Sequence, residues 1–342
     1  MKERLPYISV IIPCLNEANF IRQVIIDILH QDYPTTLMEV FFVDGGSTDN
    51  TREIIQQYAS KNPQLILLDN PDRFVPQAMN LGIQKSKGDV IIRLDAHASY
   101  PPDYFPKLIT CLARTGADNV GGVWKIAPRN NGMLARAIAI ALSHPLGVGN
   151  AMYRLDTLKE MEVDTVPFGC FRRNAFERFG EYDNRLHRNQ DIEFNKRIKK
   201  MGGSIILDPT INCTYFARDN FSALWKNNFE NGRWVILTAK YTNSFQSLSL
   251  RHFIPFLFVL YLLLVLALCV KWIFWGSHHW LEFGLVLPAI IYILLIIIFS
   301  FFIALKEGSP GLFSKLATSF LCLHISYGLG SFAGLLLSKK NS

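Results

Sequence analysis

The chain has 342 residues, of which half are hydrophobic, and a formal net charge of +7. This length predicts about two domains. The Lys and Arg residues form no basic stripe interleaved with aromatic residues, which argues against a nucleic-acid-binding protein. The six cysteines are scattered and form no CxxC pair. This pattern argues against a disulfide framework or a zinc site and predicts reduced core thiols in a cytosolic setting.

Strand and helix patterns alternate through the first hundred residues. The β-rich runs occupy 8–13, 39–44, 65–70 and 89–95, and helical patterns follow the first three of them at 20–29, 54–58 and 76–86. Thr48 or Asp49 is expected to cap the second helix. Such alternation predicts a mostly parallel sheet of the α/β class with helices on both faces. Ligands bind such sheets at the carboxyl ends of the strands.

The next hundred residues follow a less regular pattern. An alanine-rich stretch near 133–142 is helical in spacing, and a late strand is expected at 204–209. Between them, the run "NQDIEFNKRIKKMGG" predicts a helix that begins near Asn189 and stops at Gly202.

Three apolar segments lie in the last third of the chain. The runs 253–270 and 281–305 are long enough to cross a bilayer, which needs about 20 mostly apolar residues. The third run, 312–337, contains Lys315, His324 and several glycines. Its softer composition leaves three alternatives open: it spans the membrane, re-enters, or lies at the interface.

We therefore expect three parts: an α/β domain at 1–220, amphipathic interface helices at 221–250, and a membrane region at 251–342 with two or three transmembrane helices. Lys and Arg residues cluster near the apolar segments. This favours binding to anionic lipid headgroups, and we therefore expect the α/β domain to lie on the cytoplasmic side. The early apolar run at 7–13 is too short for a signal peptide. The sequence thus predicts a multi-pass protein of the cell (inner or plasma) membrane.

Polar residues follow the first two strands. "PCLNE" places Pro13, Asn16 and Glu17 at the end of one strand, and "VDGGSTDNT" places Asp44 and Gly45 at the end of the next. Asp44 is suited to accept hydrogen bonds from a nucleoside, and the glycines let the backbone approach it closely. A turn followed by a helix cap explains either segment equally well.

"LDAH" follows the fourth strand and supplies two candidate metal ligands. Asp95 and His97 would share one face, because residues i and i+2 of an extended strand point to the same side. A divalent ion between this pair and a diphosphate would neutralise charge on a departing nucleotide. The alternative is a surface aspartate beside a hydrogen-bonded histidine.

Two further segments offer chemistry. Asp191 lies in the first turn of its predicted helix, where the helix dipole favours an ionised carboxylate that is suited to act as a general base. Alternatively, the charge of Asp191 only stabilises the start of the helix and takes no part in catalysis. In "ENGRW", Arg233 is suited to bind a phosphate, and Trp234 either stacks on a sugar or anchors at the membrane interface.

Together these segments resemble family 2 glycosyltransferases with a GT-A fold, in particular the membrane-bound branch of exopolysaccharide (succinoglycan) biosynthesis. The resemblance covers nearly the whole chain and rests on eight motifs in order: "VDGGSTD", "RLDAH..YP", "VGG", "GVGNAMYR", "DTVPFG.FRR", "RNQD.E", "GRW" and "HISYGLG". It implies that the α/β domain is a Rossmann-like GT-A catalytic domain, and that the protein transfers a sugar from a UDP-sugar to a hydroxyl of a lipid-linked saccharide, with inversion, at the cytoplasmic membrane face.

The resemblance also implies roles for residues of this chain. Asp191 would be the general base, and Asp95 and His97 would hold Mn²⁺ or Mg²⁺. The nucleotide-sugar would contact residues in four segments of the chain: Pro13, Asn16, Glu17, Asp44, Gly45, Asp95, Arg233 and Trp234.

Three residues depart from the family's pattern. His97 replaces the second acid of the DxD motif, Gln190 replaces the glutamate before Asp191, and Glu230 replaces the glutamine of QxxRW. The last departure argues against a processive polymerase and favours one sugar per encounter. Imidazole suits softer first-row ions, so we expect Mn²⁺ to support activity better than Mg²⁺, and activity to fall below about pH 6.5 as His97 protonates. Two alternatives stay open: a polyprenyl-phosphate glycosyltransferase and a non-catalytic nucleotide-binding membrane scaffold.

Overall fold

The computed structural model describes residues 4–155, 157–243, 250–276 and 280–337. Their contacts divide them into two compact units. The sheet unit contains the residues up to Ile126 together with Ala151–Phe216, and the helical unit contains Ala127–Asn150, Ala217–Asn243 and the described residues from 250 onward. The expected division at residue 220 assigns the segment 127–150 to the α/β domain. The contacts instead group this segment with the C-terminal helices. Part of the expected interface segment, 244–249, lies outside the described residues.

One nine-stranded sheet forms the centre of the sheet unit. Its strands are β1 Ile8–Cys14, β2 Met38–Asp44, β3 Leu65–Asp69, β4 Val90–Arg93, β5 Ala98–Ser99, β6 Asn119–Ala127, β7 Met161–Glu162, β8 Cys170–Arg172 and β9 Ile205–Phe216. The order is β3-β2-β1-β4-β8-β6-β9-β5, with β7 paired to β9. The first four strands pair in parallel, as expected. The pairs β4–β8, β6–β8, β5–β9 and β7–β9 are antiparallel, so the sheet is mixed.

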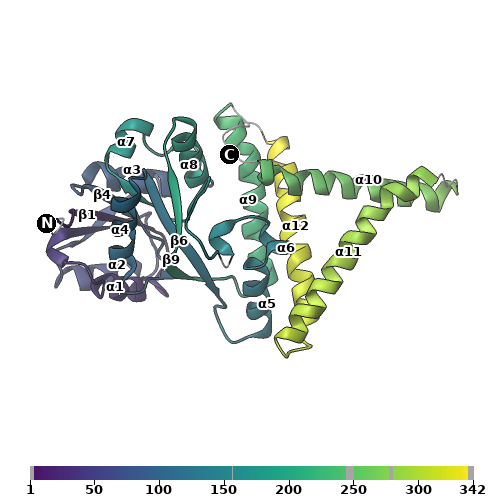
Figure 1. Cartoon of the computed structure of the whole chain (residues 1–342), viewed down its shortest axis with the longest axis horizontal. Helices are drawn as coiled ribbons and strands as arrows, with labels where there is room; N and C mark the ends of the chain where they lie inside the picture. The colour runs from purple at the N-terminus through teal and green to yellow at the C-terminus, as the bar shows by residue number, and fades with distance from the viewer. Residues whose placement is uncertain (1–3, 156, 244–249, 277–279, 338–342) are drawn as a thin grey trace. The chain divides into compact units, whose positions relative to one another are not determined.

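Helices cover both faces of this sheet, which confirms the expected α/β architecture (Figure 1). The helices are α1 Ile21–Leu29, α2 Thr51–Ala59, α3 Val75–Lys85, α4 Tyr104–Thr115, α7 Asn174–Phe179 and α8 Gln190–Lys200, with short 3₁₀ turns at Thr35–Leu37 and Met152–Arg154. Apolar residues of α1, α2 and α4 pack on one face of the sheet, and those of α3, α7 and α8 pack on the other. The alternation of short apolar runs therefore produces two cores.

Two local predictions about this unit are wrong. β4 ends at Arg93, so Asp95 lies after the strand and His97 lies in the turn that follows, and the shared-face argument does not apply to them. The second helix has Asn50 at its N-cap, without a side-chain cap, while Asp49 accepts a hydrogen bond from the backbone N–H of Thr51. The expected start of α8 is confirmed, because Asn189 is its N-cap residue.

The helical unit contains every long apolar helix of the described chain. Its elements are α5 Met133–Leu142, α6 Pro145–Val148, α9 Phe221–Tyr241, a 3₁₀ turn at Leu250–Phe253, α10 Ile254–Trp275, α11 Trp280–Lys306 and α12 Leu312–Leu336. By length and composition, α10, α11 and α12 can each cross a membrane. Half of the most apolar window of α12 is buried inside the protein, against 11% for α10 and α11. The less apolar composition of α12 is thus explained by its contacts with other parts of the protein along one side.

α9 and α12 run side by side and in the same direction (Figure 1). Glycines permit this close approach: a Cβ on Gly232 would overlap the carbonyl oxygen of Tyr327, and a Cβ on Gly330 would overlap that of Phe229. Lys240 of α9 donates hydrogen bonds to the carbonyl oxygens of Gly334, Leu335 and Leu337 at 2.7–2.9 Å. A cation at the C-terminal end of α12 complements the helix dipole there.

Candidate functional site

The loops after β1 and β2 are joined by hydrogen bonds at the carboxyl edge of the sheet. The Asn16 side-chain oxygen accepts from the backbone N–H of Thr48 at 2.8 Å, and Ser47 Oγ accepts from the N–H of Asn16 at 2.9 Å. Thr51 Oγ1 accepts from the N–H of Glu17 at 2.8 Å. Asn16 has a φ of 57°, a conformation that asparagine tolerates better than most residues. The parallel pairing of β1 with β2 explains why two loops 30 residues apart meet.

Asp44 organises the second of these loops. Its side chain is fully buried, and its Oδ2 accepts from the N–H groups of Gly46 and Ser47 at 3.0 Å and from Arg52 at 2.8 Å. Burial alone would raise the pKa of Asp44, but the hydrogen bonds from Ser47 and Arg52 outweigh it and hold this pKa below its ordinary value. Both oxygens already have donors inside the loop, so contact with a nucleoside stays a prediction for this residue.

Gly45 and Pro13 have positions that restrict their neighbours. A Cβ on Gly45 would lie 2.9 Å from the carbonyl oxygen of Arg73, so the loop after β3 can approach only a glycine here. Arg73 itself has a φ of 68°, which is rare for a residue with a side chain. Pro13 lies inside β1 opposite Val43. The loops after the first three strands therefore meet at the strand ends in a region of strained backbone. Such strain is common at ligand sites.

His97 is held by Glu17. The Nδ1 atom of His97 lies 3.3 Å from Oε1 of Glu17, and its ring lies edge-on to Tyr215 at 6.0 Å between centroids. A carboxylate only accepts hydrogen bonds, so this contact favours the tautomer that carries its proton on Nδ1. The lone pair then lies on Nε2, which is the arrangement found when a carboxylate orients a metal-binding histidine. Sequence reasoning assigned Glu17 to the nucleoside and missed this contact.

Asp95 fits the role of a metal ligand by its chemistry. Its side chain is 23% exposed, and its Oδ1 accepts from Arg93 at 3.2 Å. Within the part of the chain that the structure describes, Oδ2 accepts no hydrogen bond. An oxygen of this kind together with an imidazole nitrogen suits a first-row divalent ion, and such ions are often held by one or two protein ligands plus substrate phosphates. By their chemistry Asp95 and His97 are suited to a Mn²⁺ or Mg²⁺ ion shared with a diphosphate, and this assignment stays a prediction.

Asp191 lies near Asp95 through a common partner. It occupies the first turn of α8, its side chain is 33% exposed, and its Oδ2 lies 3.8 Å from Nη1 of Arg93. Burial would lower the pKa of Arg93, but the charges of Asp95 and Asp191 outweigh burial and raise it. One buried cation therefore lies between the predicted metal ligand and the predicted base. Sequence reasoning missed Arg93, although a lone charge in the apolar run "VIIRL" was a visible signal.

Arg233 and Trp234 belong to the helical unit, on α9. Arg233 pairs with Glu230 one turn earlier at 3.1 Å, while its Nε is buried and has no hydrogen-bond partner among the described residues. Trp234 is only 4% exposed and stacks on Tyr241 with ring centroids 6.4 Å apart. Stacking on a sugar or anchoring at an interface requires an exposed ring, which Trp234 does not offer here. A donor contact by either residue stays a prediction.

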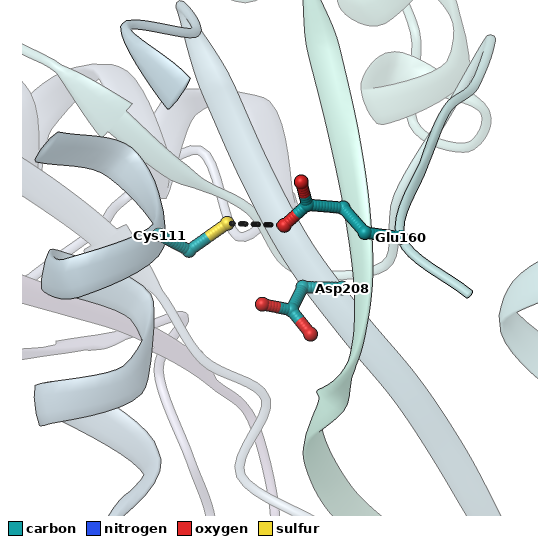
Figure 2. A group of neighbouring side chains, drawn as sticks. All are labelled: Cys111, Glu160 and Asp208. Atoms are coloured by element: carbon teal, nitrogen blue, oxygen red, sulfur yellow. Dashed lines mark hydrogen bonds between the residues drawn. The ribbon is translucent and has the colours of Figure 1, made fainter. Parts of the chain in front are cut away.

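A second group of possible metal ligands lies between α4 and β9 (Figure 2). Cys111 Sγ lies 3.9 Å from Glu160 Oε2, and the carboxylate of Asp208 is close to both. Burial, followed by the charges of Asp208 and Glu160, raises the pKa of the Cys111 thiol to about 12, so this thiol remains protonated. Arg114 pairs with Glu160 and lies 3.6 Å from Asp208. The single charge of Arg114 therefore already compensates part of the negative charge of these two carboxylates. All six cysteines are free, and five of them are buried.

Comparison with known proteins places these features in a family. The family model described as glycosyl transferase family 2 matches residues 9–180. The succinoglycan biosynthesis protein ExoA of Rhizobium meliloti is 32% identical over 228 residues, which cover 66% of this chain and 67% of the relative. A Methanococcus voltae dolichyl N-acetyl-α-D-glucosaminyl phosphate 3-β-D-2,3-diacetamido-2,3-dideoxy-β-D-glucuronosyltransferase is 26% identical over 346 residues, or 98% of both chains.

Two further comparisons bear on acceptor and fold. The undecaprenyl-phosphate 4-deoxy-4-formamido-L-arabinose transferase of Pseudomonas savastanoi pv. phaseolicola is 30% identical over 189 residues, covering 50% of this chain and 52% of the relative. Among solved structures, the mannosyltransferase PcManGT from Pyrobaculum calidifontis, in complex with GDP-Man and Mn²⁺, aligns with a TM-score of 0.61 at 20% identity. That alignment covers 96% of this chain and 88% of PcManGT and shows a shared fold.

Proposed function

The chain belongs to glycosyl transferase family 2 and is a glycosyltransferase, and on that premise we propose a specific reaction for it. It transfers a sugar from a UDP-sugar to a hydroxyl of a lipid-linked saccharide at the cytoplasmic face of the cell membrane, with inversion at the anomeric carbon. The product enters the synthesis of an exopolysaccharide or another cell-surface glycan.

One observation carries this proposal. Asp95 follows β4 and Asp191 lies in the first turn of α8, nearly a hundred residues later, yet both carboxylates lie within 4 Å of the same Arg93 guanidinium. In a direct displacement, the attacking hydroxyl and the leaving diphosphate act on the same anomeric carbon. The base must therefore lie beside the group that holds the donor diphosphate.

The residues have the following roles in the reaction. Asp191 takes the proton from the acceptor hydroxyl, whose oxygen forms a bond to the anomeric carbon. The bond from that carbon to the diphosphate breaks, and its electron pair leaves with UDP. A donor with an α linkage thereby gives a β-glycoside. Asp95 and His97 would hold a divalent ion, which would neutralise charge on the departing diphosphate. The joined loops at Asn16 and Asp44 shape the nucleotide site.

The membrane region supports a lipid-linked acceptor. α10 and α11 expose large apolar side chains along most of their length, as membrane-spanning helices do. The names of the R. meliloti and M. voltae relatives describe exopolysaccharide synthesis and transfer onto a lipid-linked sugar. A membrane-bound enzyme with an acceptor of this kind accounts for both features. Mn²⁺ is the preferred ion, because His97 supplies one of the two donor atoms.

A polyprenyl-phosphate glycosyltransferase is the second candidate, favoured by the name of the P. savastanoi relative. Its nucleophile would be a lipid phosphate, which is already ionised and needs no general base. The two candidates therefore differ in their need for Asp191. A non-catalytic nucleotide-binding scaffold would release no UDP at all.

The test compares Asp191→Asn with Glu193→Gln in the purified full chain with Mn²⁺, UDP-sugars and, as competing acceptors, lipid-linked saccharides and polyprenyl phosphate. Glu193 lies in the same helical turn and pairs with Arg197 at 2.8 Å, so it controls for loss of a carboxylate there. We expect D191N to lose about 10²–10⁴-fold in kcat and E193Q to stay within about threefold. Full activity of D191N, with the sugar found on bare polyprenyl phosphate, would favour the second candidate.

A further inference from the structure

Arg93 is buried in a place where an arginine is costly. It is the last residue of β4, its side chain is 7% exposed, and its three strand neighbours Val90, Ile91 and Ile92 are core residues. Burying a guanidinium is unfavourable unless charges and hydrogen bonds compensate for lost water. Among the residues that the structure describes, its ion-pair partners are Asp95 and Asp191, two partly exposed carboxylates near the strand end.

The neighbouring Arg172 shows how a structural arginine is satisfied in this fold. On β8, which pairs with β4, Arg172 Nε donates to the carbonyl oxygen of Ala117 at 3.2 Å and Nη2 donates to that of Leu112 at 2.8 Å. Arg93 differs, because its Nε and Nη1 are buried and donate to no backbone carbonyl oxygen among the described residues. The hydroxyl of Tyr182 is a further polar neighbour of this guanidinium. A structural role in linking backbone segments, as Arg172 has, therefore does not explain the buried position of Arg93.

Its geometry toward the two carboxylates is asymmetric. Nη2 donates to Asp95 Oδ1 at 3.2 Å, whereas Nη1 lies 3.8 Å from Asp191 Oδ2, which is an ion pair but too long for a hydrogen bond. Oδ1 of Asp191 accepts from the N–H of Ile192. Asp191 Oδ2 is therefore attracted toward Arg93 while keeping its lone pairs available for the proton of a hydroxyl.

We propose that Arg93 is a positioning residue that holds Asp95 and Asp191 on a rigid planar cation and so sets the spacing between the metal-binding carboxylate and the base. This inference rests on the proposed function of those two residues. Arg93 acts through the carboxylates and not on the donor, since it is almost fully enclosed. Its charge also offsets the mutual repulsion of the two carboxylates, which would otherwise move them apart.

The test uses the full chain with Arg93→Met, Arg93→Lys and the control Arg172→Lys. A misplacement of about 1 Å can reduce a rate about 10²-fold, so we expect R93M to lower kcat by about that factor while the acceptor KM changes less than about threefold. R93K keeps the positive charge but lacks the planar guanidinium, so its kcat should be about tenfold higher than that of R93M. R172K should lower the unfolding temperature and leave kcat within about threefold.

Two further readouts separate positioning from a general structural effect. Mn²⁺ binding, followed by electron paramagnetic resonance without donor, should weaken at least about threefold in R93M and remain unchanged in R172K, because only Arg93 orients Asp95. At saturating Mn²⁺, R93M should lower kcat much less in the D191N background than in the wild type, because the part of its effect that passes through Asp191 is then absent.

Several results would overturn this inference. Folded R93M with kcat within about threefold of the wild type excludes a positioning role, and so does an R93M effect of equal size in the D191N background. Full activity of D191N would instead remove the proposed function. Arg93 would then be judged by Mn²⁺ binding alone, and an unchanged affinity in R93M would overturn the inference as well.

Discussion

Replacing Asp44 with asparagine tests whether this residue organises the loop after β2. The change keeps the shape of the side chain but removes the negative charge that accepts from Gly46, Ser47 and Arg52. One acceptor oxygen is also replaced by an NH₂ group, which would face donors and cannot accept from them. The loop that ties β2 to the loop of Asn16 would therefore lose its central acceptor.

The expected loss of stability follows from these contacts. A hydrogen bond to a charged group contributes about 1.5–3 kcal/mol, and loss of a partner in a buried ion pair costs about 3–5 kcal/mol. The ion-pair share is smaller here, because Arg52 is partly exposed and keeps a second partner, Asp69, at 2.7 Å. We expect a total loss of about 2–3 kcal/mol. In a unit of about 200 residues this lowers the unfolding temperature by about 5–10 °C.

The assay is thermal unfolding of the full chain in detergent, with Asp69→Asn as the matched control. Asp69 pairs with the same Arg52 but is 77% exposed, so D69N should cost less than about 1 kcal/mol. The pKa of Asp44 is lowered in the folded state, so its contribution is complete above the ordinary aspartate pKa of about 3.9 and is lost as the pH falls through the folded value. The difference between wild type and D44N should stay constant from pH 8 to about 5 and shrink below about pH 4. A D44N shift no larger than that of D69N would refute this account.

Three other predictions concern packing and the metal. Gly45→Ala places a Cβ 2.9 Å from the Arg73 carbonyl and should cost about 1–3 kcal/mol in thermal unfolding; an unchanged unfolding temperature would contradict the close approach. Gly330→Ala, whose Cβ would overlap the Phe229 carbonyl oxygen, should cost at least as much at the α9–α12 contact, while Gly284→Ala, whose Cβ meets nothing within 4 Å, should cost much less; equal shifts would argue against that contact. At equal concentration Mn²⁺ should support more activity than Mg²⁺, and His97→Ala should abolish the preference; the same preference in H97A would remove His97 from the metal site.

Local sequence pattern was sufficient for the framework. The apolar runs of the first hundred residues became β1 to β4, and the helical spacings between them became α1, α2 and α3. Composition alone also located the three long apolar helices, because twenty consecutive apolar residues have few other uses. These features depend on neighbours in the sequence, so sequence reasoning could predict them.

Contacts between distant residues could not be predicted in the same way. The pairing of Glu17 with His97 joins residues 80 positions apart, and that of Arg93 with Asp191 joins residues 98 apart. The packing of Gly330 against α9 depends on a helix about a hundred residues earlier. Each of these contacts results from the sheet order or the helix pairing, which local periodicity does not contain.

The sugar linkage of the product tests the central claim most directly. The purified full chain is incubated with Mn²⁺, UDP-sugars with α linkages and a lipid-linked saccharide, and the product's anomeric configuration is read by NMR. The account predicts one sugar in β linkage on a saccharide hydroxyl and one UDP released per transfer. An α linkage, a sugar attached to bare lipid phosphate, or no UDP release with any donor would contradict it.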